Sequence, residues 1–158
     1  NGLLSIDQSA YLKKHSTVTC LHRVIEDWRE MINDGNIIGT CFLDISKCFD
    51  SIDHLILINK LEKYGINGTE KKWFTNYLSC RSQIVKCNGK MSNKLNVEIG
   101  VPQGSILGPI LFLIYINDLT QNCNGAQCNL FADDALFYVQ DIDTVNKKLQ
   151  DCVNTVEN

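Results

Sequence analysis

The residues 131–134, Phe-Ala-Asp-Asp, place two adjacent carboxylates between apolar runs at residues 130–132 and 135–139. Both runs are rich in aromatic, aliphatic or β-branched side chains, which predicts two short strands with the acids at the turn of a tight hairpin. Neighbouring carboxylates repel each other, so a fold retains such a pair mainly where a divalent cation neutralises it. The alternative is that aspartate is present only because it suits turns. The pair alone does not decide between them.

A third acid, Asp44, stands near the end of a largely apolar run at residues 37–45. The run predicts a buried strand, where a carboxylate is costly unless it is paired or bound to metal. Residues 100–109 form a third feature, in which Gly and Pro punctuate both ends around the amide of Gln103. Such a turn can let the backbone approach a ligand closely, although the spacing alone also fits an ordinary turn. In this order, the three features suit two-metal nucleotidyl transfer, in which acids from separate strands hold two cations ~4 Å apart.

Composition limits the interpretation. The chain has 158 residues, 44% hydrophobic and 21% charged, which fits one globular domain or a large fragment of one. Its formal net charge is -3, so any nucleic-acid contact must be local or come from other segments. Eight cysteines include no C-x-x-C pair, which favours a reduced intracellular protein over a disulfide scaffold. No signal peptide is evident, and the apolar run at residues 106–116 is interrupted and too short for a bilayer, so we expect no membrane association.

Helical periodicity predicts most of the remaining elements. Ser16 or Thr17 caps a helix whose apolar positions recur through Ile32. Asp50, Ser51 and Asp53 suit the cap of a second helix at about residues 55–64, and for Asp50, Asp53 and His54 we favour capping and local hydrogen bonds over direct chemistry. Further helices are predicted at residues 110–116, apolar all round and deeply buried, and at residues 142–156.

A third helix is predicted after Asn67, which forms a capping box with Glu70. Its aromatic residues are expected on the buried side, because core packing is the usual role of such a cluster. Strands follow at residues 81–87 and 94–99, with Asn88-Gly89 between them as a hairpin signal inside a connection longer than two residues. The expected buried side of the third helix consists of Trp73, Phe74, Tyr77 and Leu78.

These motifs resemble the reverse transcriptases of non-LTR retrotransposons. Residues 42–54 resemble motif A of that family, residues 100–109 resemble motif B, and residues 131–134 resemble motif C, in the same order and spacing. Gln8-Ser9 with Ser16-Thr17 resembles the segment ahead of motif A. The chain departs from the family where Ala10-Tyr11-Leu12 replaces a common Gly-Phe-Arg, which removes a basic residue, and where Cys48 replaces a common Ala.

The resemblance implies a role for each matching residue. Asp44 and Asp133 are expected to ligate two Mg²⁺ ions, with Mn²⁺ as an alternative, helped by the Ile45 carbonyl and supported by Asp134. These three aspartates are the expected catalytic residues. The expected nucleotide-binding residues are Lys47 and Cys48 through backbone N–H groups to the triphosphate, Phe49 under the sugar as a barrier to a 2′-hydroxyl, and Gln103 and Gly104 in the nucleotide and template pocket.

The resemblance also implies a fold and partners. We expect an α+β polymerase palm, a small antiparallel sheet backed by helices, with a partial fingers segment at residues 1–35, the palm at residues 36–158, and the thumb absent. The implied activity is RNA-directed DNA polymerase, with an RNA template, a DNA primer and deoxynucleoside triphosphates, completed by fingers and thumb segments of a full-length protein. An active element would work in the nucleus and cytoplasm. Two alternatives stay open, a catalytically inert remnant that acts only in binding, and another palm polymerase.

Overall fold

The computed structural model describes residues 2–122, 125–140 and 145–157. The chain divides into two compact units, which are described separately below. The first combines Asn1–Ser46 with Ile116–Asn158, and the second is Lys47–Tyr115.

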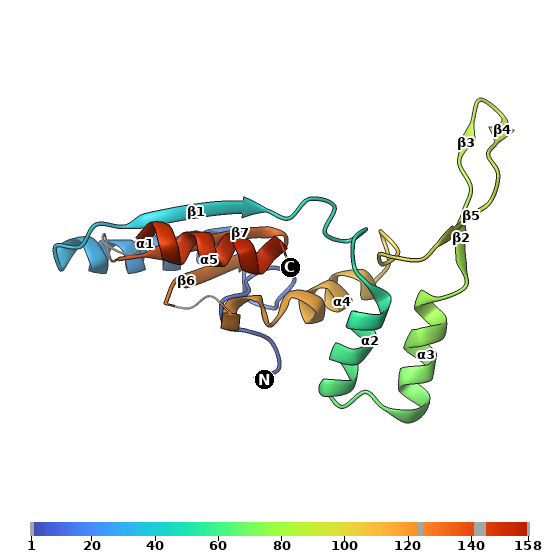
Figure 1. Ribbon diagram of the computed structural model, residues 1–158, viewed down its shortest axis with the longest axis horizontal. Coiled ribbons are helices and arrows are strands. Elements are labelled where there is room, and N and C mark those ends of the chain that lie inside the picture. Colours follow the sequence, from blue (N-terminus) through green and yellow to red (C-terminus); the bar gives the residue numbers. More distant parts are fainter. Residues whose placement is uncertain (1, 123–124, 141–144, 158) are drawn as a thin grey trace. The chain divides into compact units, whose positions relative to one another are not determined.

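The first unit contains a three-stranded antiparallel sheet in the order β1-β7-β6 (Figure 1). The strands are β1 (Gly39–Asp44), β6 (Gln127–Phe131) and β7 (Asp134–Val139). β6 and β7 form the predicted hairpin around the adjacent acids, and β1 pairs with β7 from Gly39↔Val139 to Asp44↔Asp134. The predicted α+β class, with a small antiparallel sheet and helices, is confirmed.

The prediction that residues 37–45 form a buried strand is wrong. β1 lies at an edge of the sheet and pairs only with β7, and its residues alternate between half-buried and exposed. Phe42 is 71% exposed, and Asp44 at the strand end is also exposed. The apolar run indicated a buried strand, but β1 pairs with one strand only, whereas β7 pairs on both sides.

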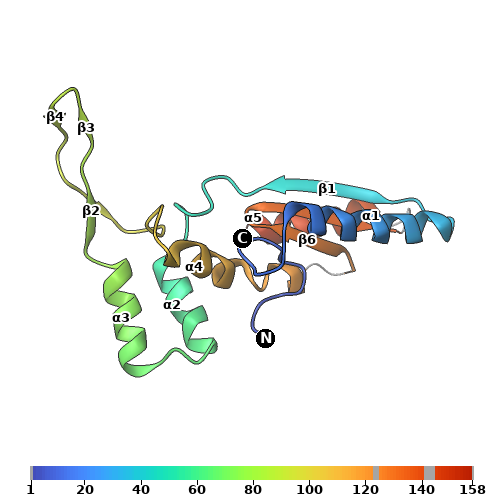
Figure 2. The same ribbon diagram turned by 180° about the vertical axis from the view of Figure 1, so that it is seen from behind.

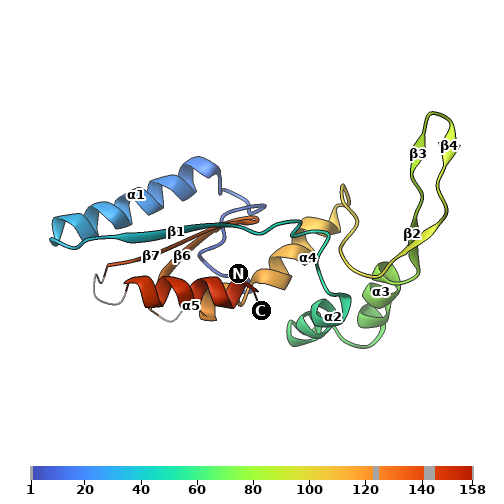
Figure 3. The same ribbon diagram turned by 45° about the horizontal axis from the view of Figure 1, so that its top comes forward.

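Helices α1 (Thr17–Asn33) and α5 (Val145–Glu157) lie on opposite sides of the sheet (Figure 3). α1 begins where the sequence predicts, because Ser16 and Thr19 form a reciprocal capping box. It packs through an edge-to-face contact between Trp28 and Tyr138, whose ring centroids are 6.1 Å apart. α5 contacts β1 and β7, and it begins at Val145. The predicted start of this helix at Ile142 lies outside the described residues.

The second unit contains α2 (His54–Lys63) and α3 (Gly68–Leu78), which pack against each other (Figure 2). Asp53 caps α2 as predicted and accepts a hydrogen bond from the Ile56 amide. The predicted capping box at α3 is not formed, because the Asn67 side chain makes no cap hydrogen bond. The predicted buried side of α3 is also wrong. Only Leu78 is buried, and Trp73 is 52% exposed.

After α3 the chain extends into a β-arm, residues 81–97 (Figure 2). Its base is the pair β2 (Arg81–Gln83) and β5 (Leu95–Val97), and its tip is the pair β3 (Lys86–Cys87) and β4 (Lys90–Met91). Asn88-Gly89 forms the predicted turn, with φ of 49° and 76°, as a type I′ hairpin requires. The connection between β3 and β4 has two residues, so the longer one predicted is wrong.

The apolar helix α4 (Leu107–Ile116) begins before Gly108-Pro109, three residues earlier than predicted, and a 3₁₀ turn, η1 (Leu119–Asn122), follows it. Its burial is less complete than its composition indicates. Leu111, Phe112 and Leu113 are buried, but Ile110 is 50% exposed. Among the helices that the structure describes, none has both the length and the apolar character needed to cross a membrane.

Gly100 and Gly104 of motif B both have positive φ, 84° and 76°, but only Gly100 is crowded. A Cβ at Gly100 would lie 2.8 Å from the Asp50 carbonyl oxygen, whereas one at Gly104 would meet open space. We therefore expect Gly100→Ala to lower the free energy of unfolding by about 3 kcal/mol or more, and Gly104→Ala by about 1–2 kcal/mol, the left-handed backbone term alone.

Urea unfolding followed by Trp73 fluorescence, in a Trp28→Phe background, measures both changes in the second unit. The chain has two tryptophans, so this background isolates the signal of Trp73. Equal midpoints for the two alanine variants would contradict the crowding at Gly100.

Candidate active site

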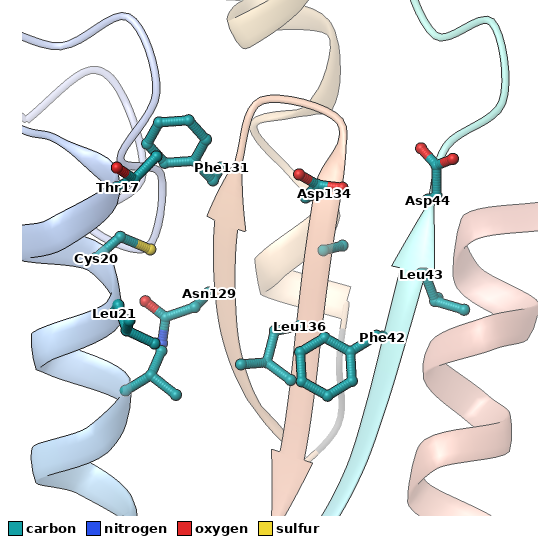
Figure 4. Close-up of a pocket in the computed structure, with 12 residues that line it drawn as sticks. Thr17, Cys20, Leu21, Phe42, Leu43, Asp44, Asn129, Phe131, Asp134 and Leu136 are labelled. Carbon is teal, nitrogen blue, oxygen red and sulfur yellow. The ribbon is translucent and has the colours of Figure 1, made fainter.

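The sheet register brings Asp44 and Asp134 together. They are cross-strand partners of β1 and β7, on the face that also carries Phe42 and Leu136 (Figure 4). Both carboxylates are exposed, and Asp133 is half-buried in the adjoining turn. Like charges directly opposite on two strands are destabilising. The fold therefore retains an unfavourable pair at one end of its central strand.

The turn between β6 and β7 is tight and carries backbone strain. Phe131 pairs with Asp134, so Ala132 and Asp133 form a two-residue loop. Ala132 has a φ of 57°, which is uncommon for a residue with a side chain. The Asp133 carbonyl accepts a hydrogen bond from the Ile45 amide at 3.3 Å, which links the turn to the residue after Asp44.

Gln8 holds this turn from a distant part of the chain. Its Oε1 accepts from the Ala132 amide at 3.2 Å and from the Ala10 amide at 2.7 Å, and the residue is 2% exposed. Gln8 is itself held beside β6, because the Ser9 amide donates to the Leu130 carbonyl and the Leu130 amide donates to the Asp7 carbonyl. Apart from the resemblance of Gln8-Ser9 to the segment ahead of motif A, no sequence pattern indicated this contact.

A polar network fixes α1 against the same sheet face. Arg23 donates to Asn129 Oδ1 from Nε and from a terminal nitrogen, at 3.1 and 2.6 Å. Asn129 in turn donates to the Tyr138 hydroxyl, and that hydroxyl donates to Asp27 at 2.5 Å. Burial and the neighbouring Asp27 carboxylate raise the pKa of Tyr138 far above its ordinary value. The hydroxyl therefore stays protonated and remains a donor to Asp27.

Between α1 and the sheet lies a hollow of about 520 Å³ with the two acids at one end (Figure 4). Most of its lining is apolar, and Phe42, Leu136 and Leu21 contribute to its walls. Low-dielectric walls next to charged groups strengthen the field at the open end of a cleft. The hollow is lined by Thr17, Cys20, Leu21, Val24, Phe42, Leu43, Asp44, Asn129, Phe131, Asp134, Ala135 and Leu136.

The predicted nucleotide-binding residues lie in the second unit, Lys47–Tyr115. Lys47 has a φ of 53° at the start of a tight turn, and Cys48 next to it is buried. Phe49 is half-buried and packs against Phe112, with ring centroids 4.6 Å apart. Gly104 is exposed. The structure thus places these residues and the three acids in separate units.

Within the second unit, motifs A and B are joined by side-chain hydrogen bonds that the sequence did not predict. Gln103 Nε2 lies 2.9 and 3.0 Å from the two carboxylate oxygens of Asp50. His54 Nε2 lies 2.7 Å from the Gly100 carbonyl oxygen. Capping was the wrong prediction for Asp50 and His54, which instead hold residues about fifty positions away. No local sequence signal indicates partners at that separation.

The acids are suitable ligands for a divalent cation, but they do not form a closed metal site by themselves. Within residues 2–122, 125–140 and 145–157, no three His, Cys, Asp or Glu side chains form a group that could hold a metal ion. Mg²⁺ is usually held by one or two carboxylates, with substrate phosphates and waters completing its shell. Asp44 and Asp134 on one sheet face meet that requirement, and the Ile45 and Asp133 carbonyls are further oxygen donors nearby in the chain.

Comparisons with known proteins point to one family. The chain matches the family described as "Reverse transcriptase (RNA-dependent DNA polymerase)" over residues 3–158. It is 33% identical over 120 residues to a probable RNA-directed DNA polymerase from transposon X-element of Drosophila melanogaster, which covers 76% of this chain and 13% of the relative. It is 32% identical over 112 residues to the RNA-directed DNA polymerase from mobile element jockey of Drosophila funebris, covering 71% of this chain and 12% of the relative.

Solved structures show the same fold. Telomerase from Candida albicans, determined in complex with a fragment of telomeric RNA, superimposes with a TM-score of 0.71 at 14% identity. The match covers 94% of this chain and 29% of that protein. The chain therefore spans only a small part of the proteins that it resembles.

Removing the Gln8 acceptor tests how the acidic turn is held. Gln8→Met has a similar volume but leaves the Ala132 and Ala10 amides buried without their acceptor. Each such amide costs about 1–3 kcal/mol, so we expect the free energy of unfolding to fall by about 2–6 kcal/mol. Hydrogen exchange at the Ala132 amide should accelerate in the native state.

Gln127→Leu is the matched control, because Gln127 is exposed on β6 and makes no contact with the turn loop. Its effect should stay within about 0.5 kcal/mol. Unchanged protection of the Ala132 amide in Gln8→Met would show that the turn does not depend on Gln8.

Proposed function

Because the chain belongs to the reverse transcriptase family, we propose that it is the palm core of an RNA-directed DNA polymerase of a non-LTR retrotransposon. The proposed reaction adds deoxynucleotides to a DNA primer on an RNA template. The observation that carries the proposal is the register Asp44↔Asp134, which joins motif A to motif C on one face of the sheet. The function is assigned to a longer protein, since the chain spans 12–13% of the jockey and X-element relatives.

The family in general uses divalent metals. In this proposal Asp44, Asp133 and Asp134, with the Ile45 carbonyl, hold two Mg²⁺ ions, with Mn²⁺ as an alternative. When bound, such ions supply activation of the primer 3′-hydroxyl and neutralisation of the triphosphate and its leaving group. The chain contributes two exposed carboxylates in register, and a turn that Gln8 holds in place.

The second unit supplies the proposed nucleotide contacts. The backbone amides of Lys47 and Cys48 face the triphosphate, and Phe49 lies under the sugar, where its packing on Phe112 fixes the ring. Gln103 and Gly104 line the nucleotide and template pocket. The Asp50 carboxylate accepts from Gln103 Nε2, so it orients the amide with its oxygen available to a ligand.

The proposed partners are an RNA template, a DNA primer, deoxynucleoside triphosphates, and the fingers and thumb segments of the full-length protein. The division into a partial fingers segment at residues 1–35 and a palm at residues 36–158 is part of this proposal. The proposal also includes an intracellular location of the protein, in the nucleus and cytoplasm if the element is active.

Primer extension by the full-length protein tests the acids. Asp44→Asn and Asp133→Asn should each abolish extension, because each removes a ligand charge that the reaction requires. The free energy of unfolding should stay equal or rise in Asp44→Asn, since the substitution relieves repulsion with Asp134.

Asp34→Asn, in the same unit and exposed, is the matched control for loss of one negative charge. It should extend primers at the wild-type rate. Normal extension by Asp44→Asn or Asp133→Asn would overturn the two-metal assignment. A wild-type full-length protein that binds primer and template without extending would favour the inert remnant.

Phe49→Val tests the choice of sugar. If the ring lies under the sugar, a smaller side chain opens space for a 2′-hydroxyl, and the ratio of ribonucleotide to deoxynucleotide incorporation should rise. Deoxynucleotide use should fall less, because the acids and Gln103 remain. The measurement is the incorporation efficiency for each nucleotide class, compared between wild type and variant.

Phe112→Leu is the control, because it loosens the same ring contact without changing residue 49. It should lower both incorporation rates alike, through a cavity that costs about 1–3 kcal/mol. An unchanged ratio in Phe49→Val, with uniformly lower rates, would return Phe49 to a purely core role.

A further inference from the structure

Trp73, Tyr77 and Arg81 form a continuous stack along α3 and into β2. The rings of Trp73 and Tyr77 are parallel within 8°, with centroids 5.4 Å apart. The Arg81 guanidinium lies 5.5 Å from the centroid of the Tyr77 ring. Trp73 and Tyr77 are four residues apart, which places them on one side of α3, and Arg81 follows at the start of β2. Trp73 is therefore the end member of a stack of planar groups.

This stack is exposed where a core role would bury it. Trp73 is 52% exposed, and Tyr77 is half-buried. Phe74 meets the Trp73 ring edge-on at 5.0 Å, which holds the indole in place from the side. A rigid tryptophan presented to solvent at the end of a stack offers a planar surface to another planar group.

The β-arm that continues from this stack carries only positive charge. Residues 79–97 contain Arg81, Lys86, Lys90 and Lys94 and no acidic residue, and all four basic residues are exposed. No ion pair between described residues involves any of them. The four charges therefore remain available to an anionic partner.

The two units carry opposite net charges, which the net charge of the whole chain conceals. The unit Lys47–Tyr115 has nine basic and five acidic residues, net +4, whereas the other unit has six basic and thirteen acidic residues, net -7. A local nucleic-acid contact is therefore expected in this unit, whose charge has the opposite sign to that of the whole chain.

The cations lie on both faces of the arm. Lys86 pairs with Met91 across the β3–β4 ladder, and Lys90 pairs with Cys87. Cross-strand partners share a face and successive residues alternate, so Lys86 and Lys90 point to opposite faces. This distribution suits a flexible polyanion that can wrap around the arm better than a flat, rigid anionic surface.

We propose that α3 and the β-arm bind single-stranded nucleic acid, with a base stacked on Trp73 and the phosphates along Arg81, Lys86, Lys90 and Lys94. Aromatic and guanidinium platforms beside a basic track are what single strands recognise, because every base has a π-face. This site is distinct from the nucleotide-adding residues of the proposed function and rests on that function only in expecting nucleic acid as a partner.

Fluorescence anisotropy with a labelled oligouridylate and the 158-residue chain measures the affinity. Lys86→Glu/Lys90→Glu should weaken binding about tenfold or more, with a shallower dependence on salt. The matched control is Lys13→Glu/Lys14→Glu, which makes the same change in net charge at exposed residues of the other unit. It should weaken binding less than about threefold, the part due to overall charge alone. Equal losses in the two variants would overturn the proposal.

Trp73 fluorescence gives a direct readout of stacking. In a Trp28→Phe background Trp73 is the only tryptophan, and Trp28 Nε1 has no hydrogen-bond partner to lose. The oligouridylate should quench this signal at the concentration at which anisotropy saturates. Trp73→Ala should weaken binding about fivefold or more, and Trp73→Phe should restore most of the affinity. Binding without quenching would overturn the stacking.

Two further experiments distinguish the proposal from the alternatives. Poly-glutamate at equal charge should compete poorly, because it offers no planar groups, and full competition would instead assign an acidic protein as the partner. Asp44→Asn/Asp133→Asn removes two negative charges and should bind the oligouridylate at least as tightly as the wild type does. Loss of primer extension with binding retained would thus leave this inference standing, and loss of binding in the arm variant alone would leave the catalytic assignment standing.

Discussion

A buried hydrogen bond from the Ala132 amide to Gln8 Oε1 ties the acidic turn to a distant part of the chain. A residue with a side chain at a φ of 57° costs on the order of 1–3 kcal/mol, so the turn persists only where its surroundings determine it. Gln8 supplies that constraint from 124 positions away, and its own place is set by main-chain bonds to Leu130. The segment ahead of α1 is therefore part of the acidic site, although it carries none of the acids.

Local signals in the sequence predicted several local features correctly, although the capping box expected at Asn67 is not formed. Ser16 and Asp53 cap their helices, Asn88-Gly89 turns the β-arm, and the β6–β7 hairpin places the acids at its turn. In each case neighbouring residues determine the backbone conformation, so no knowledge of distant partners is needed. The expected convergence of Asp44 with the acidic hairpin came from the order of the motifs, and the register supports it.

Features that depend on what covers an element could not be predicted in this way. An apolar run indicated a buried strand at residues 37–45, but burial depends on neighbours, and β1 has one neighbouring strand. Trp73 was assigned to the core because a helix with four apolar residues usually buries them, yet the helix contacts only α2 in its own unit to any large extent. The contacts of Asp50 with Gln103 and of His54 with Gly100 join residues about fifty positions apart.

The separation of charge between the two units fits the chemistry that we propose for each of them. A unit that holds carboxylates for cations must tolerate their mutual repulsion, and exposure of Asp44 and Asp134 to water limits that cost. A unit that holds polyphosphates or nucleic acid needs positive charge. That positive charge is hidden when the charges of the whole chain are added together. Net charge and pI are sums, so they describe neither unit. For a chain with this division, the sign of each unit, and the exposed planar groups beside the basic one, carry the information about partners that the total of -3 conceals.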